Sequence, residues 1–344
     1  MRDLRFIQAV PDDDYYIWQT HLWLESLKEI GKSEKAISLI FTPSYRDFNE
    51  KWLKLKDLYP EAEFFFHKDT DKIDRLLGIY IPIIRPYILM KYFELHPEMK
   101  EKAIFYCDCD ILFTNKFNID KYLNDDICYL SDTNSYINAS YFDSKIKDVK
   151  QDKLEDYKLI DVLDETCKLA GINREIAVKN NDHSGGAQYL LKNIDAQFWE
   201  KVLTNCIRIR LYLQNINKIY FENENKGFQS WCADMWAVLW TLWKNNQETK
   251  VIPEMDFAWS SDSIEVLNSK TILHNAGIVD KHQTIKKDGL EIRIPTFFKG
   301  DYHQGKDPFT DPHLEFVYND EKSKTLCNHY YVTKLINLKN KYNL

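Results

Sequence analysis

The first 70 residues alternate between apolar runs of strand length and segments with the apolar spacing of helices. Leu4–Val10, Ala36–Phe41 and Glu63–His67 are interpreted as strands, and Tyr15–Ile30 and Asp47–Tyr59 as the helices between them. Strands that alternate with helices in this order form a parallel sheet whose two faces are covered by the helices. The N-terminal part of the chain is therefore expected to have an α/β fold.

Composition limits the class of protein. The chain has 344 residues, of which 44% are hydrophobic and 29% charged, so it is expected to be globular, with one large domain or two ordinary ones. Its net charge of −7 argues against a protein that coats nucleic acid over its whole surface, but not against a local basic patch. The aromatic content of 14% fits stacking or sugar-binding surfaces, although aromatic side chains more often lie in a core.

The sequence shows no sign of secretion or of membrane insertion. Its seven cysteines form no CxxC pair and no zinc spacing with histidine, which favours free thiols in a reducing compartment. The N-terminus lacks the apolar core of a signal peptide, and no apolar run approaches the roughly 18–20 residues of a membrane span. We therefore expect a cytoplasmic protein without a membrane partner. The abundance of Lys, Asn, Ile, Tyr and Asp suggests an AT-rich bacterial or viral genome, and a viral protein would act in the host cytoplasm.

Two acids, Asp108 and Asp110, interrupt the nearly continuous apolar run Ala103–Thr114. A run without alternation suits a central strand buried on both faces, and carboxylates buried at its end need compensation. In an extended chain both acids of Asp-x-Asp point to the same side, and ligands of doubly wound sheets bind beyond the carboxyl ends of the strands. The pair is therefore predicted to hold Mg²⁺ or Mn²⁺ beside a phosphate. The tripeptide alone equally allows two acids in a solvated loop.

A third candidate metal ligand lies in the segment Ile272–Lys281. This segment is interpreted as a strand that ends at His274 and is followed by Gly277 and Lys281. A lone histidine is usually structural, but imidazole is also a common metal ligand. A histidine in a strand-end turn, with a glycine three residues later and a lysine soon after, indicates a metal ligand beside a pyrophosphate clamp.

Two further features can contribute to a binding site. Gly185 and Gly186 precede a short apolar strand and permit close approach of the backbone to a ligand, although an ordinary turn explains them as well. Asp234 is the only acid in the aromatic helix Trp231–Trp243, where an acid needs a partner or a function.

Taken together, the order of these elements resembles the GT-A glycosyltransferases. More narrowly, five segments resemble the plant and algal peptidyl-serine galactosyltransferases and hydroxyproline O-arabinosyltransferases, over roughly residues 4–285. The five segments are Tyr16–Gln19 with the following SLKEIGK, Arg85-Pro86 with the helix after it, CDCD, HSGGAQ and Trp231–Trp236. The resemblance implies a single GT-A catalytic domain over residues 1–300, with a Rossmann-like mixed, mainly parallel sheet flanked by helices. Residues 1–115 would be the nucleotide-binding half, 116–300 the donor-sugar and acceptor half, and 301–344 a C-terminal cover segment.

The resemblance also implies the roles of individual residues. The metal, Mn²⁺ or Mg²⁺, would be bound by Asp108, Asp110 and His274. The nucleotide-sugar, a UDP-sugar, would be contacted by Val10, Pro11, Tyr15, Arg85, Asp108 and Lys281. The catalytic residues that face the donor sugar and the acceptor would be Asp234, Gly185 and Gly186, and Asp234 would act as a base or would support an oxocarbenium-like state.

The expected function is metal-dependent transfer of a sugar from a UDP-sugar to an acceptor hydroxyl, with retention of the anomeric configuration. Two stretches favour a hydroxymethylated pyrimidine in phage duplex DNA as the acceptor, namely Lys201–Lys218, which has no acid, and the basic segment Lys281–Lys299. A peptide serine or hydroxyproline, or a glycan hydroxyl, is the equal alternative. A nucleotidyltransferase, a phosphohydrolase and an inactive UDP-sugar-binding module are the alternatives from other classes.

The chain departs from the family in three ways. The plant enzymes are membrane-anchored in the secretory pathway, and this sequence shows neither an anchor nor a signal. The spacing from His274 to Lys281 is one residue longer than the spacing from histidine to lysine in many retaining relatives. The acid of the tryptophan helix is Asp234 rather than glutamate. For these reasons the acceptor is not carried over from the family.

Overall fold

The computed structural model describes the chain except residues 1, 79, 150–160, 278, 288–289 and 304. The chain forms two compact units, each built from three separate segments. Unit 1 comprises Met1–Arg5, His67–Tyr106 and Tyr122–Ile252, and unit 2 comprises Phe6–Phe66, Cys107–Lys121 and Pro253–Leu344. The division into 1–300 and 301–344 that the sequence suggested stays a prediction.

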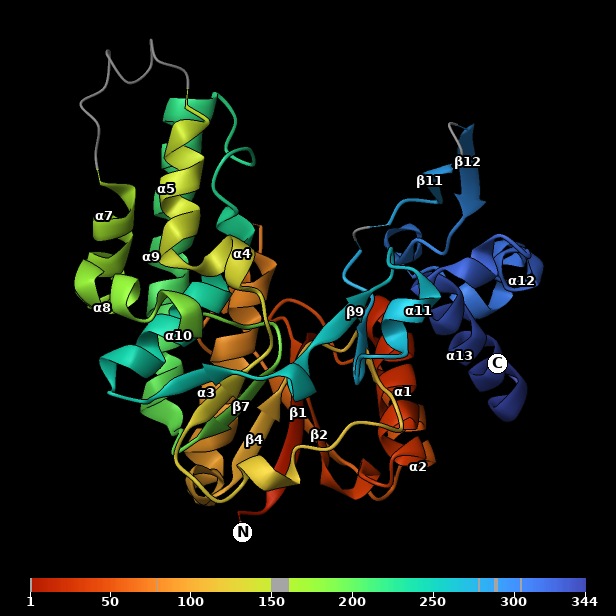
Figure 1. The fold of residues 1–344 in the computed structure, drawn as a ribbon. Coiled ribbons are helices and arrows are strands. Elements are labelled where there is room, and N and C mark those ends of the chain that lie inside the picture. Colours follow the sequence, from red (N-terminus) through yellow and green to blue (C-terminus); the bar gives the residue numbers. More distant parts are fainter. Residues whose placement is uncertain (1, 79, 150–160, 278, 288–289, 304) are drawn as a thin grey trace. The chain divides into compact units, whose positions relative to one another are not determined.

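Seven strands form one sheet in the order β3-β2-β1-β4-β7-β6-β8. Figure 1 labels β1, β2, β4 and β7 of this sheet. The strands are β1 (Leu4–Pro11), β2 (Ala36–Thr42), β3 (Glu63–Lys68), β4 (Ala103–Tyr106), β6 (Cys128–Leu130), β7 (Tyr189–Lys192) and β8 (Thr249–Val251). β1 pairs in parallel with β2, and β6 with β8, whereas β7 is antiparallel to both β4 and β6. The predicted fold class, a mixed and mainly parallel sheet flanked by helices, is confirmed.

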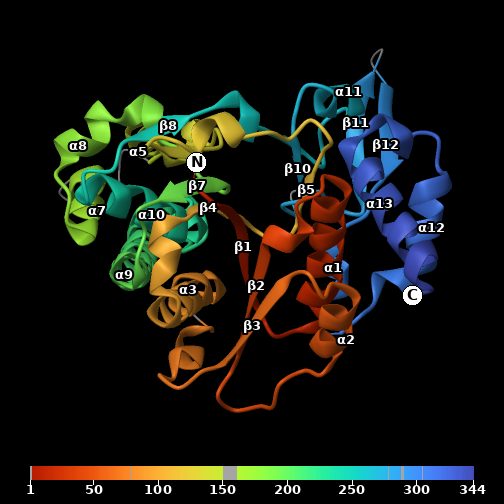
Figure 2. The same cartoon turned by 90° about the horizontal axis from the view of Figure 1, so that it is seen from below.

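The N-terminal strands and helices follow from the local sequence. β2 is buried at all seven positions, as its continuous apolar run requires. The helix α1 (Asp14–Glu29) begins after Asp13, whose carboxylate accepts a hydrogen bond from the Tyr15 amide, and it is followed by Gly31 at φ +67°. Figure 2 shows β1, β2 and β3 side by side. In the sequence, α1 connects β1 to β2, and α2 (Lys51–Leu58) lies between β2 and β3.

Unit 1 has a helical layer in which α9 (Ala196–Phe221) packs against α3 (Ile84–Leu95) and α10 (Ala233–Lys244). Trp236 and Trp240 of α10 are fully buried, and the Trp236 indole donates a hydrogen bond of 2.7 Å to the Ile137 carbonyl. The aromatic helix predicted from the sequence is therefore part of the core. The shorter helices of this unit are α4 (Asn134–Ile137), α5 (Ala139–Lys147), α7 (Val162–Ala170) and α8 (Arg174–Lys179).

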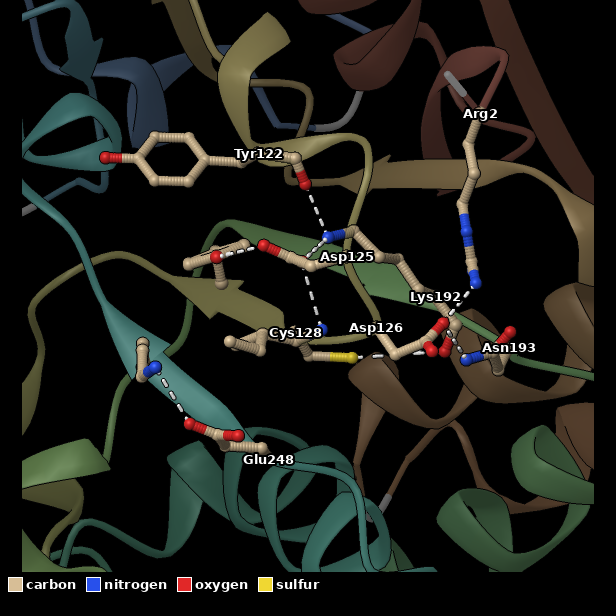
Figure 3. Close-up of polar contacts among 11 residues, drawn as sticks. Arg2, Tyr122, Asp125, Asp126, Cys128, Lys192, Asn193 and Glu248 are labelled. Carbon is tan, nitrogen blue, oxygen red and sulfur yellow. Dashed lines mark hydrogen bonds and ion pairs between the residues drawn. The ribbon is translucent and has the colours of Figure 1, made fainter.

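Unit 1 also contains a buried lysine at the end of β7. The Lys192 side chain has no solvent exposure, and its ammonium lies 2.5 Å from the Asp125 carboxylate and donates to the Tyr122 carbonyl (Figure 3). The same ammonium lies 4.8 Å from the centre of the Tyr129 ring. Burial lowers the pKa of Lys192 below its ordinary value, although Asp125 opposes the shift.

Unit 2 contains a three-stranded sheet in the order β5-β10-β9, made of β5 (Ile111–Phe113), β10 (Ile272–His274) and β9 (Phe257–Trp259). The predicted strand before the Asp-x-Asp stretch is present as β4, and the apolar residues after the acids form a separate strand, β5. The chain leaves the seven-stranded sheet after Tyr106, turns at Cys109 and Asp110, and pairs Ile111–Phe113 with β10 instead. A turn at this point lets both apolar runs pair in sheets while the acids between them are not held in a ladder.

The C-terminal residues of unit 2 pack on α1. The helix α13 (Cys327–Tyr342) shares one hydrophobic cluster with α1, and this cluster includes Trp18, Leu22 and Leu335. The remaining elements of the unit are α11 (Ile264–Leu267), α12 (Pro312–Asn319) and the hairpin of β11 (His282–Lys287) and β12 (Leu290–Pro295). Among the helices that the structure describes, none is both long and apolar enough to cross a membrane.

Candidate metal site

The three predicted metal ligands come together in unit 2. Asp108 and Asp110 lie in the turn between β4 and β5, and His274 is the last residue of β10. The antiparallel register pairs His274 with Ile111, and the Asn275 amide donates a hydrogen bond of 2.9 Å to the Asp110 carbonyl. The pairing of β5 with β10 therefore places the histidine beside the acids.

The geometry of these side chains fits a divalent cation. His274 Nε2 lies 3.4 Å from Asp110 Oδ1 and 3.9 Å from Asp108 Oδ2, and one ligand atom from each residue lies within 4.8 Å of the others. Adjacent ligands about 2.1 Å from an octahedral ion lie about 3.0 Å apart, so small movements would complete the set. Asp110 Oδ1 is buried and accepts no hydrogen bond from any residue within the described part of the chain. Two carboxylates with an imidazole suit Mn²⁺ well.

Electrostatics keeps the central ligand ionised. Burial disfavours the charged form of Asp110, but Lys299 and then His274 more than offset it and hold the pKa of this carboxyl well below its ordinary value. The Lys299 ammonium contacts Asp110 Oδ2, the oxygen other than the one nearest to His274. His274 is only 5% exposed, and its ring stacks on Trp259 at 5.4 Å between centroids. Asp110 is therefore a carboxylate, not a carboxylic acid, at neutral pH.

The predicted nucleotide-binding residues Val10, Pro11 and Tyr15 also belong to unit 2, at the end of β1 and the start of α1. The Cys107 amide donates a hydrogen bond of 3.1 Å to the Ile7 carbonyl, so β1 runs beside the chain that leads to the acids. Burial, and next the charge of Asp110, raise the pKa of the Tyr15 hydroxyl above its ordinary value.

Sequence reasoning missed Asp12 in the same turn. Asp12 is fully buried, and its Oδ2 accepts hydrogen bonds from the Thr42 hydroxyl at 2.9 Å and the Asn49 amide at 3.1 Å. The Arg46 guanidinium lies 3.6 Å from this oxygen. An acid directly after a buried strand was the available signal, and its observed role is to fasten the end of β1 to neighbouring loops.

The second missed residue is Lys299. The sequence interpretation assigned the diphosphate clamp to Lys281, but the Lys281 side chain is 56% exposed and forms an ion pair of 3.0 Å with Asp301. Lys299 is 14% exposed and is the lysine that contacts Asp110. Lys299 ends the basic stretch Lys281–Lys299, which the sequence interpretation considered as a polyanion surface. The charge of this stretch could therefore have pointed to Lys299, but its contact with Asp110 could not be predicted from the sequence.

Four predicted site residues lie in unit 1. Arg85 of α3 and Asp234 of α10 form an ion pair of 3.1 Å, and the Tyr80 hydroxyl donates to the other Asp234 oxygen at 2.8 Å. Both carboxylate oxygens of Asp234 are thus engaged. Asp234 was expected to need a partner, and that partner is the Arg85 guanidinium. The hydrogen bond from Tyr80 to Asp234 was not predicted from the sequence.

The glycine pair, Gly185 and Gly186, is packed against its own chain. A Cβ atom at Gly185 would lie 2.5 Å from the Ser131 carbonyl oxygen, and one at Gly186 would lie 2.5 Å from the Tyr189 hydroxyl. The contact at Gly185 is with backbone, so the fold requires glycine there, whereas a side chain at Gly186 would have to displace the hydroxyl end of the buried Tyr189 side chain.

Comparison with protein-family models found no match, and comparison with curated protein sequences found none either. Among solved structures, the galactosyltransferase LgtC with donor and acceptor sugar analogues has a TM-score of 0.41 and 10% identity, over 80% of this chain and 88% of its own. Mouse xyloside xylosyltransferase 1 has a TM-score of 0.38 and 12% identity, over 80% and 98%. The bifunctional glycosyltransferase WbbM has a TM-score of 0.42 and 10% identity, over 97% of this chain and 52% of its own. These similarities are too distant to support a function, so the proposal below rests on the residues of this chain.

Proposed function

We propose that this chain is a divalent-cation-dependent glycosyltransferase of the GT-A type that transfers a sugar from a UDP-sugar to an acceptor hydroxyl with retention of configuration. The observation that carries the proposal is the cluster of Asp108, Asp110 and His274 next to a buried lysine. Two carboxylates and an imidazole that converge beside a cation form a suitable site for a metal-bound diphosphate.

The proposed roles follow from the chemistry of a diphosphate leaving group. A bound Mn²⁺ or Mg²⁺ would neutralise the negative charge that develops on the diphosphate as the glycosidic bond breaks. Asp110 and His274 hold this ion directly, and Asp108 completes the set or contacts the ribose. The residues that flank the uracil are Val10, Pro11 and Tyr15.

For the unit 1 residues we propose roles at the transferred sugar and the nucleotide. Arg85 contributes a positive charge for the nucleotide-sugar, and Asp234 with Gly185 and Gly186 faces the donor sugar and the acceptor. Because both Asp234 oxygens are occupied by Arg85 and Tyr80, Asp234 is better suited to orient the guanidinium than to remove a proton. The acceptor proton then passes to the leaving phosphate, which agrees with a retaining reaction that uses no protein nucleophile.

The first acceptor to test is a hydroxymethylated pyrimidine in duplex DNA. The basic stretch on α9 presents only Lys201, Arg208 and Lys218 to solvent, because Arg210 is buried and donates to the Ser230 hydroxyl. Such a face supports limited contact with phosphates rather than wrapping of DNA. A peptide serine or hydroxyproline, or a glycan hydroxyl, is the second acceptor class.

The experiment is a UDP-release assay with a panel of UDP-sugars, in Mn²⁺ or in EDTA, each with and without hydroxymethylcytosine-containing duplex DNA. Mn²⁺-dependent release that rises with the DNA supports both the enzyme class and the acceptor. Slow Mn²⁺-dependent hydrolysis that DNA does not change supports the transferase and rejects the DNA acceptor. Products other than UDP and a glycoside indicate a nucleotidyltransferase or phosphohydrolase, and Mn²⁺-dependent binding without turnover indicates an inactive binding module.

A further inference from the structure

Asp110 is shared between two different kinds of neighbour. Its Oδ1 lies 3.4 Å from His274 Nε2, on the side of the proposed metal ligands, and its Oδ2 contacts the Lys299 ammonium. An ammonium group has three hydrogen-bond donors and no lone pair, so Lys299 is not a metal ligand. An ion bound by Asp110 would therefore lie at Oδ1, while the Lys299 ammonium lies at Oδ2 of the same carboxylate.

The backbone near Lys299 is firmly anchored. The Phe297 amide donates to Asn328 Oδ1 at 2.7 Å, and Asn328 Nδ2 donates back to the Phe297 carbonyl at 2.9 Å. Phe297 is fully buried, and its ring stacks on Tyr302 at 5.0 Å between centroids. These contacts fix the chain two residues before Lys299 and three residues after it. The position of the lysine next to Asp110 is thus built into the core of unit 2.

Gly277 gives Lys299 the space it occupies. A Cβ atom at Gly277 would lie 3.1 Å from Lys299 Cε, and Gly277 has φ +71°, which only glycine adopts without strain. The turn after His274 therefore passes directly beside the aliphatic part of Lys299. Lys281, at the end of the same turn, is exposed and paired with Asp301 instead.

The charges indicate what this arrangement binds. Asp108 and Asp110 together carry two negative charges, and a divalent cation balances them. Lys299 then leaves the site with one net positive charge, buried to 14% exposure and with donors available beyond Asp110. A diphosphate is the anion that matches a metal and an ammonium held a few ångströms apart.

We propose that Lys299, rather than Lys281, binds the donor diphosphate beside the metal, and that it moves between the Asp110 carboxylate and the diphosphate as the two ligands bind. The inference rests on the proposed function for the identity of the diphosphate. When no nucleotide is bound, the positive charge of Lys299 on Asp110 Oδ2 weakens metal binding at Oδ1 of the same carboxylate, and when the diphosphate is present the metal and Lys299 both bind it.

This relation predicts opposite effects on two binding constants. Replacing Lys299 by methionine removes a positive charge next to the metal, so Mn²⁺ alone should bind about tenfold more tightly. With Mn²⁺ saturating, the same K299M variant loses a charge-assisted contact, and UDP should bind about tenfold to a hundredfold more weakly. A residue that only supports the fold would not strengthen one ligand while weakening the other.

The experiment measures Mn²⁺ binding by electron paramagnetic resonance, and then UDP and inorganic pyrophosphate binding by calorimetry in Mn²⁺. The matched variant K281M should bind all three as the unmodified chain does, and K299R should recover part of the UDP affinity that K299M loses. Thermal unfolding of each variant verifies that it is folded.

The inference is overturned if K281M loses UDP affinity while K299M keeps it, or if K299M weakens the binding of Mn²⁺ and of UDP together. The proposed function can fail separately, because pyrophosphate binding that depends on Mn²⁺ and Lys299, without any sugar transfer from UDP-sugars, rejects the transferase and keeps the inference. Sugar transfer with unchanged binding constants in K299M keeps the transferase and rejects the inference.

Discussion

The buried ion pair of Lys192 and Asp125 in unit 1 allows a prediction about stability. The loss of stability depends on which of the two residues is removed and which is left without its partner. Replacing Asp125 by alanine leaves the Lys192 ammonium, whose side chain has no exposed surface, beside the Tyr122 carbonyl (Figure 3). The Tyr129 ring also stays near this ammonium. Removing one partner of a buried ion pair costs about 3 to 5 kcal/mol, and because Asp125 is itself 40% exposed we expect about 3 kcal/mol for D125A.

The reverse change should cost much less. In K192M the Asp125 carboxylate still accepts hydrogen bonds from the Tyr129 hydroxyl at 2.6 Å and the Ile127 amide at 3.1 Å, and it can also hydrate. Methionine fills a similar volume and removes the cost of burying the ammonium. The expected loss for K192M is about 1 kcal/mol, from the hydrogen bond to the Tyr122 carbonyl.

The assay is urea unfolding followed by circular dichroism, with free energies compared only among variants of equal m value. Y129F serves as the control, because D125A also removes the acceptor of the Tyr129 hydroxyl and this contribution has to be subtracted. If K192M destabilises the chain as much as D125A after that correction, the reasoning about the unpaired ammonium is refuted.

The pH dependence of stability provides an independent test of the same reasoning, because its direction can be predicted. Burial lowers the pKa of Lys192 below its ordinary value, and in D125A the opposing effect of Asp125 is gone, so the pKa falls further. The folded state then binds fewer protons than the unfolded state, and stability rises with pH towards the ordinary lysine pKa. D125A should therefore recover part of its lost stability in alkaline solution, whereas K192M should not.

Three other changes test the site and the fold. D110N should abolish Mn²⁺ binding and Mn²⁺-dependent UDP binding in a chain that stays folded but is less stable, because Lys299 loses its charged partner, and a variant that still binds Mn²⁺ would refute the metal role of Asp110. G186A should destabilise the chain by about 1 to 3 kcal/mol in urea unfolding, because its Cβ would lie 2.5 Å from the Tyr189 hydroxyl, and an unchanged midpoint would contradict this packing. Burial alone would raise the pKa of Glu25, but hydrogen bonds, first the one from Lys341, lower it overall. The ionised Glu25 therefore stabilises the folded state above the ordinary glutamate pKa, and this contribution is lost as pH falls through the lowered pKa. K341M should therefore flatten the acid limb of stability against pH, and an unchanged limb would contradict the assignment.

Local sequence patterns were sufficient for several elements. The strands and helices of the first 70 residues are present, with boundaries within a few residues for most of them, because apolar spacing reports which face each segment buries. The end of β10 at His274 was also predicted correctly. The two acids and the histidine were identifiable as partners because charged groups at the ends of buried strands require compensation.

Tertiary structure decided the features that join distant segments. The pairing of Ile111–Phe113 with β10 places His274 beside Asp110, and Lys299 reaches the same carboxylate from 189 residues along the chain. Arg85 and Asp234 similarly pair across unit 1, and Lys192 lies buried beside Asp125. The sequence by itself determined which segments are strands and helices and which charged residues needed a partner, since these depend on local periodicity and on the cost of burying charge. Which partner each charge met was decided only by the fold, because contacts between distant segments depend on how the sheets and helices pack and leave no trace in local spacing.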